Sequence, residues 1–200
     1  MSKEEAILLA AEQEFFAKGY DAASTASIAK TVGVTHAMVN YYYRSKEKLF
    51  FQILDGKIHA AMAGLKPLMD ADGDYVAVLT EIALAIFDMM NENRRLPFLI
   101  QDIARTHPDF LLRYKEVFQS VCMGSIGKHS ERMKQAAAQG KMRECSMHDV
   151  FDTILTLRCG PFLNLEILAN IAKIPEPRIN AYLASRREEI VKIIEARFRV

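Results

Sequence analysis

The sequence lacks the features that mark several classes of protein. Its three cysteines, Cys122, Cys145 and Cys159, are odd in number and form no Cys-x-x-Cys pair, so neither a disulfide framework nor a zinc knuckle is indicated. Only 6 prolines and 9 glycines occur in 200 residues, which excludes collagen-like and disordered chains. The net charge is only +1, so any attraction to a polyanion must come from a local cluster of charge.

Long apolar runs and a recognisable export signal are also missing. The run Ile82–Ile86 is soon interrupted by Asp88 and Asn91, far short of the roughly 20 apolar residues that a membrane-spanning helix needs. Glu4 and Glu5 stand where a signal peptide carries basic residues. We therefore expect a soluble, cytoplasmic protein with no membrane partner, and the cysteine pattern fits a reducing compartment.

The apolar residues, half of the chain, recur at helical spacing almost throughout, and no alternating strand pattern is present. Two hundred residues are enough to bury a real core. The sequence therefore predicts an all-α fold of about nine helices, separated by caps and helix breakers. The predicted helices cover residues 3–18, 25–32, 36–43, 46–65, 75–91, 96–105, 109–138, 150–172 and 178–198.

Residues 24–46 contain two short helices joined by a glycine turn. Ser24 is a suitable N-cap for the first helix, Gly33 suits the left-handed turn after it, and Thr35 precedes the second. This order is typical of a helix-turn-helix unit. The second helix of such a unit enters the major groove of DNA and brings its first residues to the base edges.

A local cluster of positive charge follows the second of these helices. Between residues 30 and 48, Lys30, Arg44, Lys46 and Lys48 stand against Glu47 alone, a local charge of +3. Cations at a helix N-terminus oppose the macrodipole, so a purely structural sequence would favour acids there. Lys46 and the free backbone N–H groups of that turn suit a DNA phosphate. The alternative interpretation is a solvated charge cluster.

Several motifs in the first fifty residues agree in order and spacing with one known family. They are Ile7-Leu-x-Ala-Ala11, Gly19-Tyr20, Ser24-x-x-x-Ile28-Ala29, Val32-Gly33-Val34-Thr35 and Val39-Asn-Tyr-Tyr-Tyr-Arg-Ser45-Lys46. Together they resemble the TetR (tetracycline repressor) family of bacterial transcription regulators. The resemblance implies a DNA-binding domain over residues 1–48. It also implies a ligand-binding and dimerisation domain over residues 49–200, which includes most of the helix that connects the two domains.

The resemblance also implies which residues contact DNA. Base contacts fall on Ala26, His36, Ala37 and Met38, next to Thr35 at the start of the reading helix. Phosphate contacts fall on Ser24, Thr25, Asn40, Tyr41, Tyr42 and Lys46. Two positions depart from the family pattern, because Asn40 stands where Tyr is more usual and Tyr43 where Phe is usual. For His36, a solvated surface role is the alternative.

Aromatic and methionine side chains recur on helical faces of the C-terminal part, which indicates either core or a pliable apolar effector pocket. The candidate pocket residues are Phe87, Met90, Phe98, Phe110, Phe118 and Phe151. The helices predicted over 150–172 and 178–198 have broad apolar faces, which suit packing within one chain or a homodimer interface as in the resembled family. We expect no metal and no other cofactor, because His107, His129 and His148 lack ligand spacing.

These observations predict a ligand-responsive transcription regulator. We expect a repressor that binds palindromic double-stranded DNA as a homodimer and is released by a small, partly apolar effector. An enzyme is not expected, because Gly124-Ser125-Ile126-Gly127 fails the Gly-x-Ser-x-Gly pattern and no Gly-rich phosphate loop occurs. The alternative function is a helical small-molecule-binding or interaction module without DNA-binding activity.

Overall fold

The structure, a computed structural model, describes residues 1–118 and 124–200, with side chains for residues 1–116 and 127–200. Apart from one isolated antiparallel bridge, the regular elements of this described part are helices, which confirms the predicted all-α class. The chain divides into two compact units. One comprises Met1–Ala60 with Leu99–Pro108, and the other Ala61–Phe98 with Asp109–Val200. The functional division at residue 48 remains a prediction.

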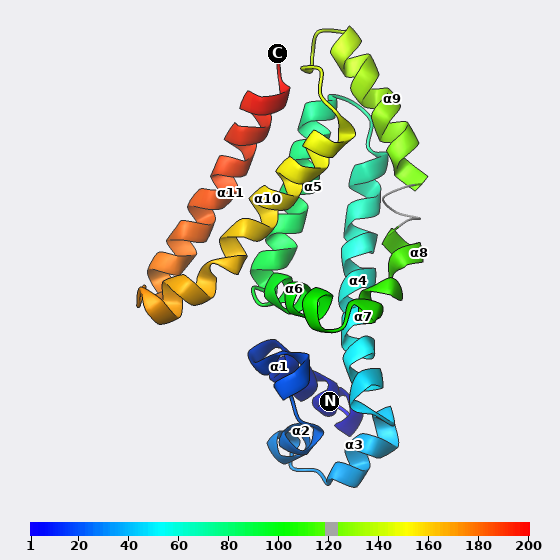
Figure 1. The fold of residues 1–200 in the computed structure, drawn as a ribbon, viewed down its shortest axis with the longest axis vertical. Helices are drawn as coiled ribbons and strands as arrows, with labels where there is room; N and C mark the ends of the chain where they lie inside the picture. The colour runs from blue at the N-terminus through cyan, green and yellow to red at the C-terminus, as the bar shows by residue number, and fades with distance from the viewer. Residues whose placement is uncertain (119–123) are drawn as a thin grey trace. The chain divides into compact units, whose positions relative to one another are not determined.

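The first unit begins with three helices, α1 (Lys3–Ala22), α2 (Thr25–Val32) and α3 (His36–Tyr43), the blue segments in Figure 1. Their boundaries follow from local chemistry. Gly19 interrupts α1 with a φ of 78°, and Gly33 ends α2 with a φ of 72°, a backbone conformation that glycine adopts without steric cost. The predicted ends of α2 and α3 are therefore confirmed. The predicted end of α1 at Lys18 is wrong, because the chain continues past the kink at Gly19 to Ala22 and closes that turn with a bond from the Ala23 amide to the Gly19 carbonyl.

An apolar core holds these helices together. Its fully buried members include Ile7, Phe15, Ile28, Val39 and Phe50. The rings of Phe15 and Phe50 meet edge to face with centroids 5.1 Å apart.

Tyr43 has a polar as well as an apolar part in this core. Its hydroxyl donates a hydrogen bond to the carbonyl of Glu4 at 2.9 Å, which joins α3 to α1. Burial raises the pKa of Tyr43 to about 12. A phenylalanine, the usual residue of the resembled family, has no hydroxyl to make this bond.

Helix α4 (Lys46–Asp70) is longer than predicted. The predicted end at Leu65, before Pro67, is wrong because the helix continues through the proline. A proline inside a helix removes the hydrogen bond to the carbonyl four residues earlier, here that of Ala63. Since Ala63 and Pro67 are both exposed, water can satisfy that carbonyl and the helix persists.

The second unit is built around α5 (Tyr75–Glu92), α10 (Met147–Leu163) and α11 (Glu176–Phe198), which run side by side in Figure 1. The rings of Phe87 and Phe162 join α5 to α10 with centroids 5.0 Å apart. The Arg187 guanidinium of α11 makes two bonds to the Asp88 carboxylate of α5, at 2.7 and 2.8 Å. Ser146 and Asp149 form a capping box at the start of α10.

Two helices predicted as continuous are divided in the structure. The segment 109–138 contains α7 (Pro108–Leu112), α8 (Lys115–Phe118) and α9 (Gly124–Ala138), so the prediction of one helix is wrong. A turn between α7 and α8 places Tyr114 inside the protein, and tertiary burial outweighs helical periodicity there. Likewise, α10 ends before a π-helical turn, η2 (Ile167–Ile171).

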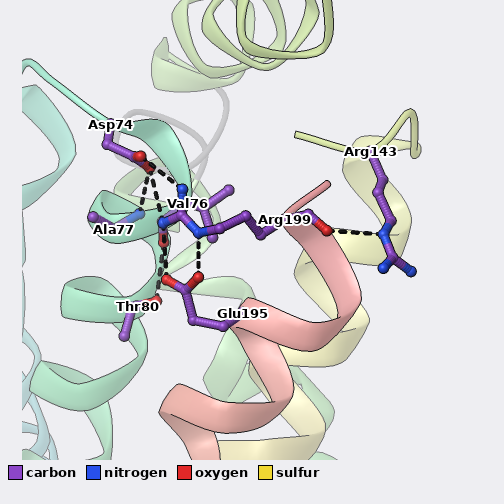
Figure 2. Close-up of polar contacts among 7 residues, drawn as sticks. All are labelled: Asp74, Val76, Ala77, Thr80, Arg143, Glu195 and Arg199. Atoms are coloured by element: carbon purple, nitrogen blue, oxygen red, sulfur yellow. Dashed lines mark hydrogen bonds and ion pairs between the residues drawn. The ribbon is translucent and has the colours of Figure 1, made fainter. Parts of the chain in front are cut away.

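The C-terminus of the second unit is held by an arginine clamp, shown in Figure 2. The Arg199 guanidinium contacts the Asp74 carboxylate at 2.8 Å and also bonds the Glu195 carboxylate. The carbonyl of Arg199 in turn accepts a hydrogen bond from Arg143 at 2.8 Å. Asp74 also caps α5 by accepting from the Ala77 amide at 3.0 Å. One side chain therefore joins the start of α5 to the last turn of α11.

We predict that Arg199→Ala lowers the melting temperature, measured by circular dichroism, more than Arg178→Ala does. Arg178 is an exposed arginine of α11 that has no side-chain partner in the described part of the chain. Hydrogen bonds from Arg199 lower the pKa of Asp74 and of Glu195. A carboxyl group whose pKa is depressed on folding stabilises the fold above its unfolded-state pKa, and this stabilisation is lost as the pH falls through the folded-state value.

The difference between wild type and Arg199→Ala should therefore be constant near neutral pH and shrink below about pH 4. Equal melting temperatures for the two variants at pH 7 would contradict the clamp.

Candidate nucleic-acid interface

The helix-turn-helix unit has one side packed in the core and one side free. Val39 and Tyr43 of α3 are buried, whereas most of the predicted DNA-contacting residues are exposed. The exposed residues are Ser24, Ala26, Thr35, His36, Ala37, Asn40, Tyr41 and Tyr42, and the half-buried ones are Thr25, Met38 and Lys46. The structure therefore gathers the predicted residues on α2, α3 and the start of α4. Their contacts with DNA remain a prediction.

Side-chain hydrogen bonds hold His36 in place at the start of α3. Its Nε2 lies 2.9 Å from the Thr25 hydroxyl of α2, and its Nδ1 lies 3.5 Å from the Asn40 amide nitrogen. Thr35 and Ser24 cap α3 and α2 through their side-chain oxygens. His36 is thus oriented by both helices before any ligand binds, which lowers the entropic cost of reading a base.

The tyrosines at the end of α3 form an exposed aromatic surface beside an arginine. Tyr41 is 69% exposed and its ring meets that of Tyr42 with centroids 5.4 Å apart. The Arg44 guanidinium lies 5.9 Å from the Tyr41 centroid. Arg44 has a φ of 65°, a backbone conformation that is uncommon for any residue except glycine. The sequence showed Arg44 only as part of a charge cluster.

Lys46 is half-buried and its ammonium group contacts two residues of α1. Its Nζ donates a hydrogen bond to the Asp21 carbonyl at 3.0 Å and lies 4.8 Å from the Tyr20 ring centroid. An ammonium group has three donors, so a bond to Asp21 leaves capacity for a phosphate. Sequence reasoning missed this contact because the partners are 25 positions apart along the chain.

A histidine from a distant part of the sequence joins the same cluster within the first unit. Nε2 of His107 lies 2.8 Å from the Asp21 carboxylate, and its ring meets Tyr20 edge to face at 5.2 Å. His107 directly follows α6 (Leu96–Thr106). The end of α6 is therefore linked, through one residue of α1, to the lysine that begins α4.

The candidate effector residues do not gather at one site. Phe87 and Met90 are buried in the core of the second unit, Phe110 is half-buried, and Phe151 is exposed on α10. The side chain of Phe118 lies outside the described residues.

Among the candidate effector residues, Phe98 lines a hollow of about 250 Å³ whose walls also include Phe162, Leu165 and Ile179. Two ion pairs cross its rim, Arg94 with Glu176 and Arg95 with Glu166, each at 2.6 Å. The roles of the six candidate residues as effector contacts remain a prediction.

The described residues hold no group of three His, Cys, Asp or Glu side chains placed as metal ligands would be. Cys145 and Cys159 are free thiols, and burial raises the pKa of both. Cys122 lies outside the described residues.

The N-terminal part of the chain is similar in sequence to a known protein family. Residues 7–53 match the sequence profile of bacterial regulatory proteins of the tetR family. No curated protein sequence matches the chain.

Solved structures share the fold over nearly the whole chain. A TetR transcription regulator from Haloarcula marismortui has a TM-score of 0.64 at 17% identity and covers 98% of each chain. A protein from Mesorhizobium loti assigned to the TetR family has a TM-score of 0.57 at 20% identity, covering 99% of this chain and 97% of that one. A Clostridium perfringens protein named a fatty acid metabolism regulator has a TM-score of 0.63 at 19% identity, covering 94% and 96%.

The fold and the interface together define a class of all-helical proteins with an N-terminal helix-turn-helix unit. Within that class, residues 7–53 match the sequence profile of the tetR family of bacterial regulatory proteins, and the whole chain has the fold of solved structures of TetR-family regulators. The profile match over residues 7–53 supports DNA-binding transcriptional regulation as the class of function.

We predict that Thr25→Val relaxes base preference without unfolding the first unit. The substitution conserves shape but removes the hydroxyl that positions His36, so discrimination at the base pair that His36 reads should fall by about fivefold. The preference is measured by sequencing DNA retained from a random duplex pool. Thr31→Val is the matched control, since the Thr31 hydroxyl bonds only within α2, to the Ser27 carbonyl. Unchanged preference in Thr25→Val would contradict the positioning role.

Proposed function

We propose that this protein is a ligand-responsive transcriptional repressor that binds a palindromic operator as a homodimer. The observation that carries the proposal is the exposed face of α3, where His36 is held between Thr25 and Asn40. Since both ring nitrogens are engaged, a bond from His36 to a base edge in the major groove would replace the 3.5 Å contact with Asn40, while Thr25 keeps the ring in place. The match of residues 7–53 to the sequence profile of a family of regulators supports the same function.

The exposed tyrosines and cations around α3 supply candidate contacts to the DNA backbone. Hydroxyl, amide and ammonium groups all bind phosphate oxygens, and such contacts fix the register of a protein on DNA. Tyr42, Asn40 and Lys46 lie on α3 or at the start of α4. In a dimer, two α3 helices about 34 to 36 Å apart would occupy successive major grooves.

A second copy of this chain is the partner that best fits the exposed apolar residues of α10 and η2. Phe151 is 54% exposed and Leu155 lies one turn further along α10, while Ile167 and Ile171 are exposed on η2. Solvent-exposed apolar patches of this kind mark sites of association. Ile154 of the predicted dimer helices instead packs inside its own chain.

The segment that contains α10 and η2 is also long and apolar enough to be compared with a membrane-spanning helix. Met147–Ile171 is long enough to cross a membrane, and its most apolar 18-residue window has a mean hydropathy of 1.2 with 6% of that window buried. Asp149, Asp152, Arg158 and Glu166 interrupt it, and such charges are costly in a lipid interior. A protein interface tolerates them at its polar rim.

Effector binding in the second unit would reach the DNA-reading helices through continuous elements. Helices α4 and α6 each contain residues of both units. The end of α6 contacts Asp21 through His107, and Asp21 in turn holds Lys46. An effector that prefers one position of these helices would shift the population of dimers that fit the operator.

We predict that Lys46→Ala weakens binding to duplexes of any sequence by about tenfold at 0.1 M salt. It should also reduce the slope of log affinity against log salt by about one for each bound protomer. Fluorescence anisotropy with a random-sequence duplex measures both. Lys134→Ala, which removes the same charge from an exposed position of α9, is the control. An unchanged slope for Lys46→Ala would contradict its phosphate contact, whereas a wild type that binds no duplex at all would favour a module without DNA-binding activity.

We predict that Phe151→Glu converts the dimer to monomers in sedimentation analysis. The new carboxylate would be buried against apolar atoms of the second copy, which disfavours association. Leu112→Glu places the same charge at a residue that is also exposed but lies on α7, and it should leave the dimer intact. A dimer that survives Phe151→Glu but not Leu112→Glu would place the interface elsewhere.

A further inference from the structure

The second unit contains a buried polar cluster that the proposed DNA interface does not use. It comprises Tyr75, the first residue of α5, with His129 and Arg132 of α9. Tyr75 is 4% exposed and His129 is 6% exposed. The Tyr75 hydroxyl lies 3.2 Å from Nδ1 of His129, and the Arg132 guanidinium lies 5.1 Å from the centroid of the Tyr75 ring.

Several nitrogen donors of this cluster have no acceptor among the described residues. Nε2 of His129 and both terminal nitrogens of Arg132 are shielded from solvent and have no hydrogen-bond partner in the described part of the chain. When the Tyr75 hydroxyl donates to Nδ1, the proton of His129 is on Nε2, which then also needs an acceptor. Buried donors without partners are rare in folded proteins, so these donors call for an oxygen atom that the described residues do not supply.

The charge of the cluster also favours an anionic ligand. Arg132 forms no ion pair with a carboxylate of the described residues. The facing charged groups are Lys128, one position before His129, and Asp70 of α4, which lies 3.3 Å from Lys128. Burial, with Arg132 and Lys128 nearby, lowers the pKa of His129, so its imidazole is neutral at pH 7. The unbalanced charge is the guanidinium.

The surroundings are apolar. Tyr75 belongs to the core cluster of the second unit, together with Leu65 of α4, Leu79 of α5 and Met133 of α9. A ligand for these donors therefore needs an oxyanion at one end and an apolar body.

We propose that His129 and Arg132 bind the oxyanion of a small-molecule acid, with Tyr75 holding the imidazole in the donating tautomer. His129 and Arg132 are three positions apart on α9 and so share one face of the helix. Guanidinium and imidazole N–H groups together bind a carboxylate or a phosphate monoester, and charge-assisted bonds of this type are stronger than neutral ones.

The site also lies next to an element that continues into the first unit. The Lys128–Asp70 pair links the same turn of α9 to the last residue of α4. A bound anion would attract the Lys128 ammonium and so weaken its ion pair with Asp70. Weakening this pair would change the preferred position of the last turn of α4. This regulatory role, unlike the binding site itself, rests on the proposed function.

The first arm of the test needs no ligand. Arg132→Met keeps an apolar stem of similar length and removes the unpartnered charge, so it should raise the melting temperature of the free protein. Lys128→Met removes a cation that is paired with Asp70 and should not raise it. A melting temperature for Arg132→Met equal to or below that of wild type would show that the guanidinium is already satisfied, and would overturn the proposal.

The second arm measures binding by calorimetry to probes with matched bodies. Octanoate and octyl phosphate are compared with 1-octanol, and benzoate and phenyl phosphate with benzyl alcohol. We expect at least one acid to bind wild type about tenfold or more tightly than its alcohol, and Arg132→Met to lose that preference. The comparison of carboxylate with phosphate identifies which oxyanion is taken. No binding by any acid, or equal binding of acid and alcohol, would overturn the proposal, and this wild-type comparison stands even if the variant does not fold.

The outcome is separable from that of the proposed function because neither arm contains DNA. The acid that binds is then added to the complex with duplex DNA. Binding that depends on Arg132 but leaves DNA affinity unchanged would support the oxyanion site and contradict the ligand response. Failure to bind DNA at all would leave the calorimetric result intact.

Discussion

The two helices of the helix-turn-helix unit are too short to exist by themselves. Helices α2 and α3 have eight residues each, whereas isolated helices below about 12 residues are marginal in water. Their stability comes from packing, because α2 contacts both α1 and α3 and the shared core contains Phe15 and Phe50. The exposed polar face of α3 depends on this core, since His36 is positioned only while α2 keeps Thr25 beside it.

The second unit depends on polar contacts at its ends as well as on its apolar centre. Arg199 joins the start of α5 to the end of α11, and Arg187 joins the same two helices through Asp88. Each exposed pair contributes little alone, but together they join α5 to α11 near both ends of α5. Tyr75 lies directly after the Asp74 cap, so this clamp also positions the phenol that orients His129.

The features predictable from the sequence were those determined within a few residues. Ser24, Gly33 and Thr35 set the limits of α2 and α3 through caps and turns, which act locally. The end of α4 was missed because the exposure of Ala63, which lets water replace the bond lost at Pro67, is not a local signal.

The candidate DNA interface could be predicted from the sequence only in outline. The spacing and the family resemblance placed its residues on one unit, but the contact of Lys46 with Asp21 joins positions far apart in sequence. Helical periodicity says which side chains face inward and nothing about whether a buried donor finds an acceptor. For that reason His129 and Arg132 were unremarkable in the sequence and stand out only when their hydrogen-bond partners are counted.

The central claim is that two copies of this chain read a symmetric DNA site with their α3 helices. The most direct test is to bind the purified protein to a pool of random duplex DNA at moderate salt and to sequence what is retained. We expect enrichment of a two-fold symmetric sequence whose half-sites are about one helical turn apart. A pool that shows no enrichment at any salt concentration would contradict it.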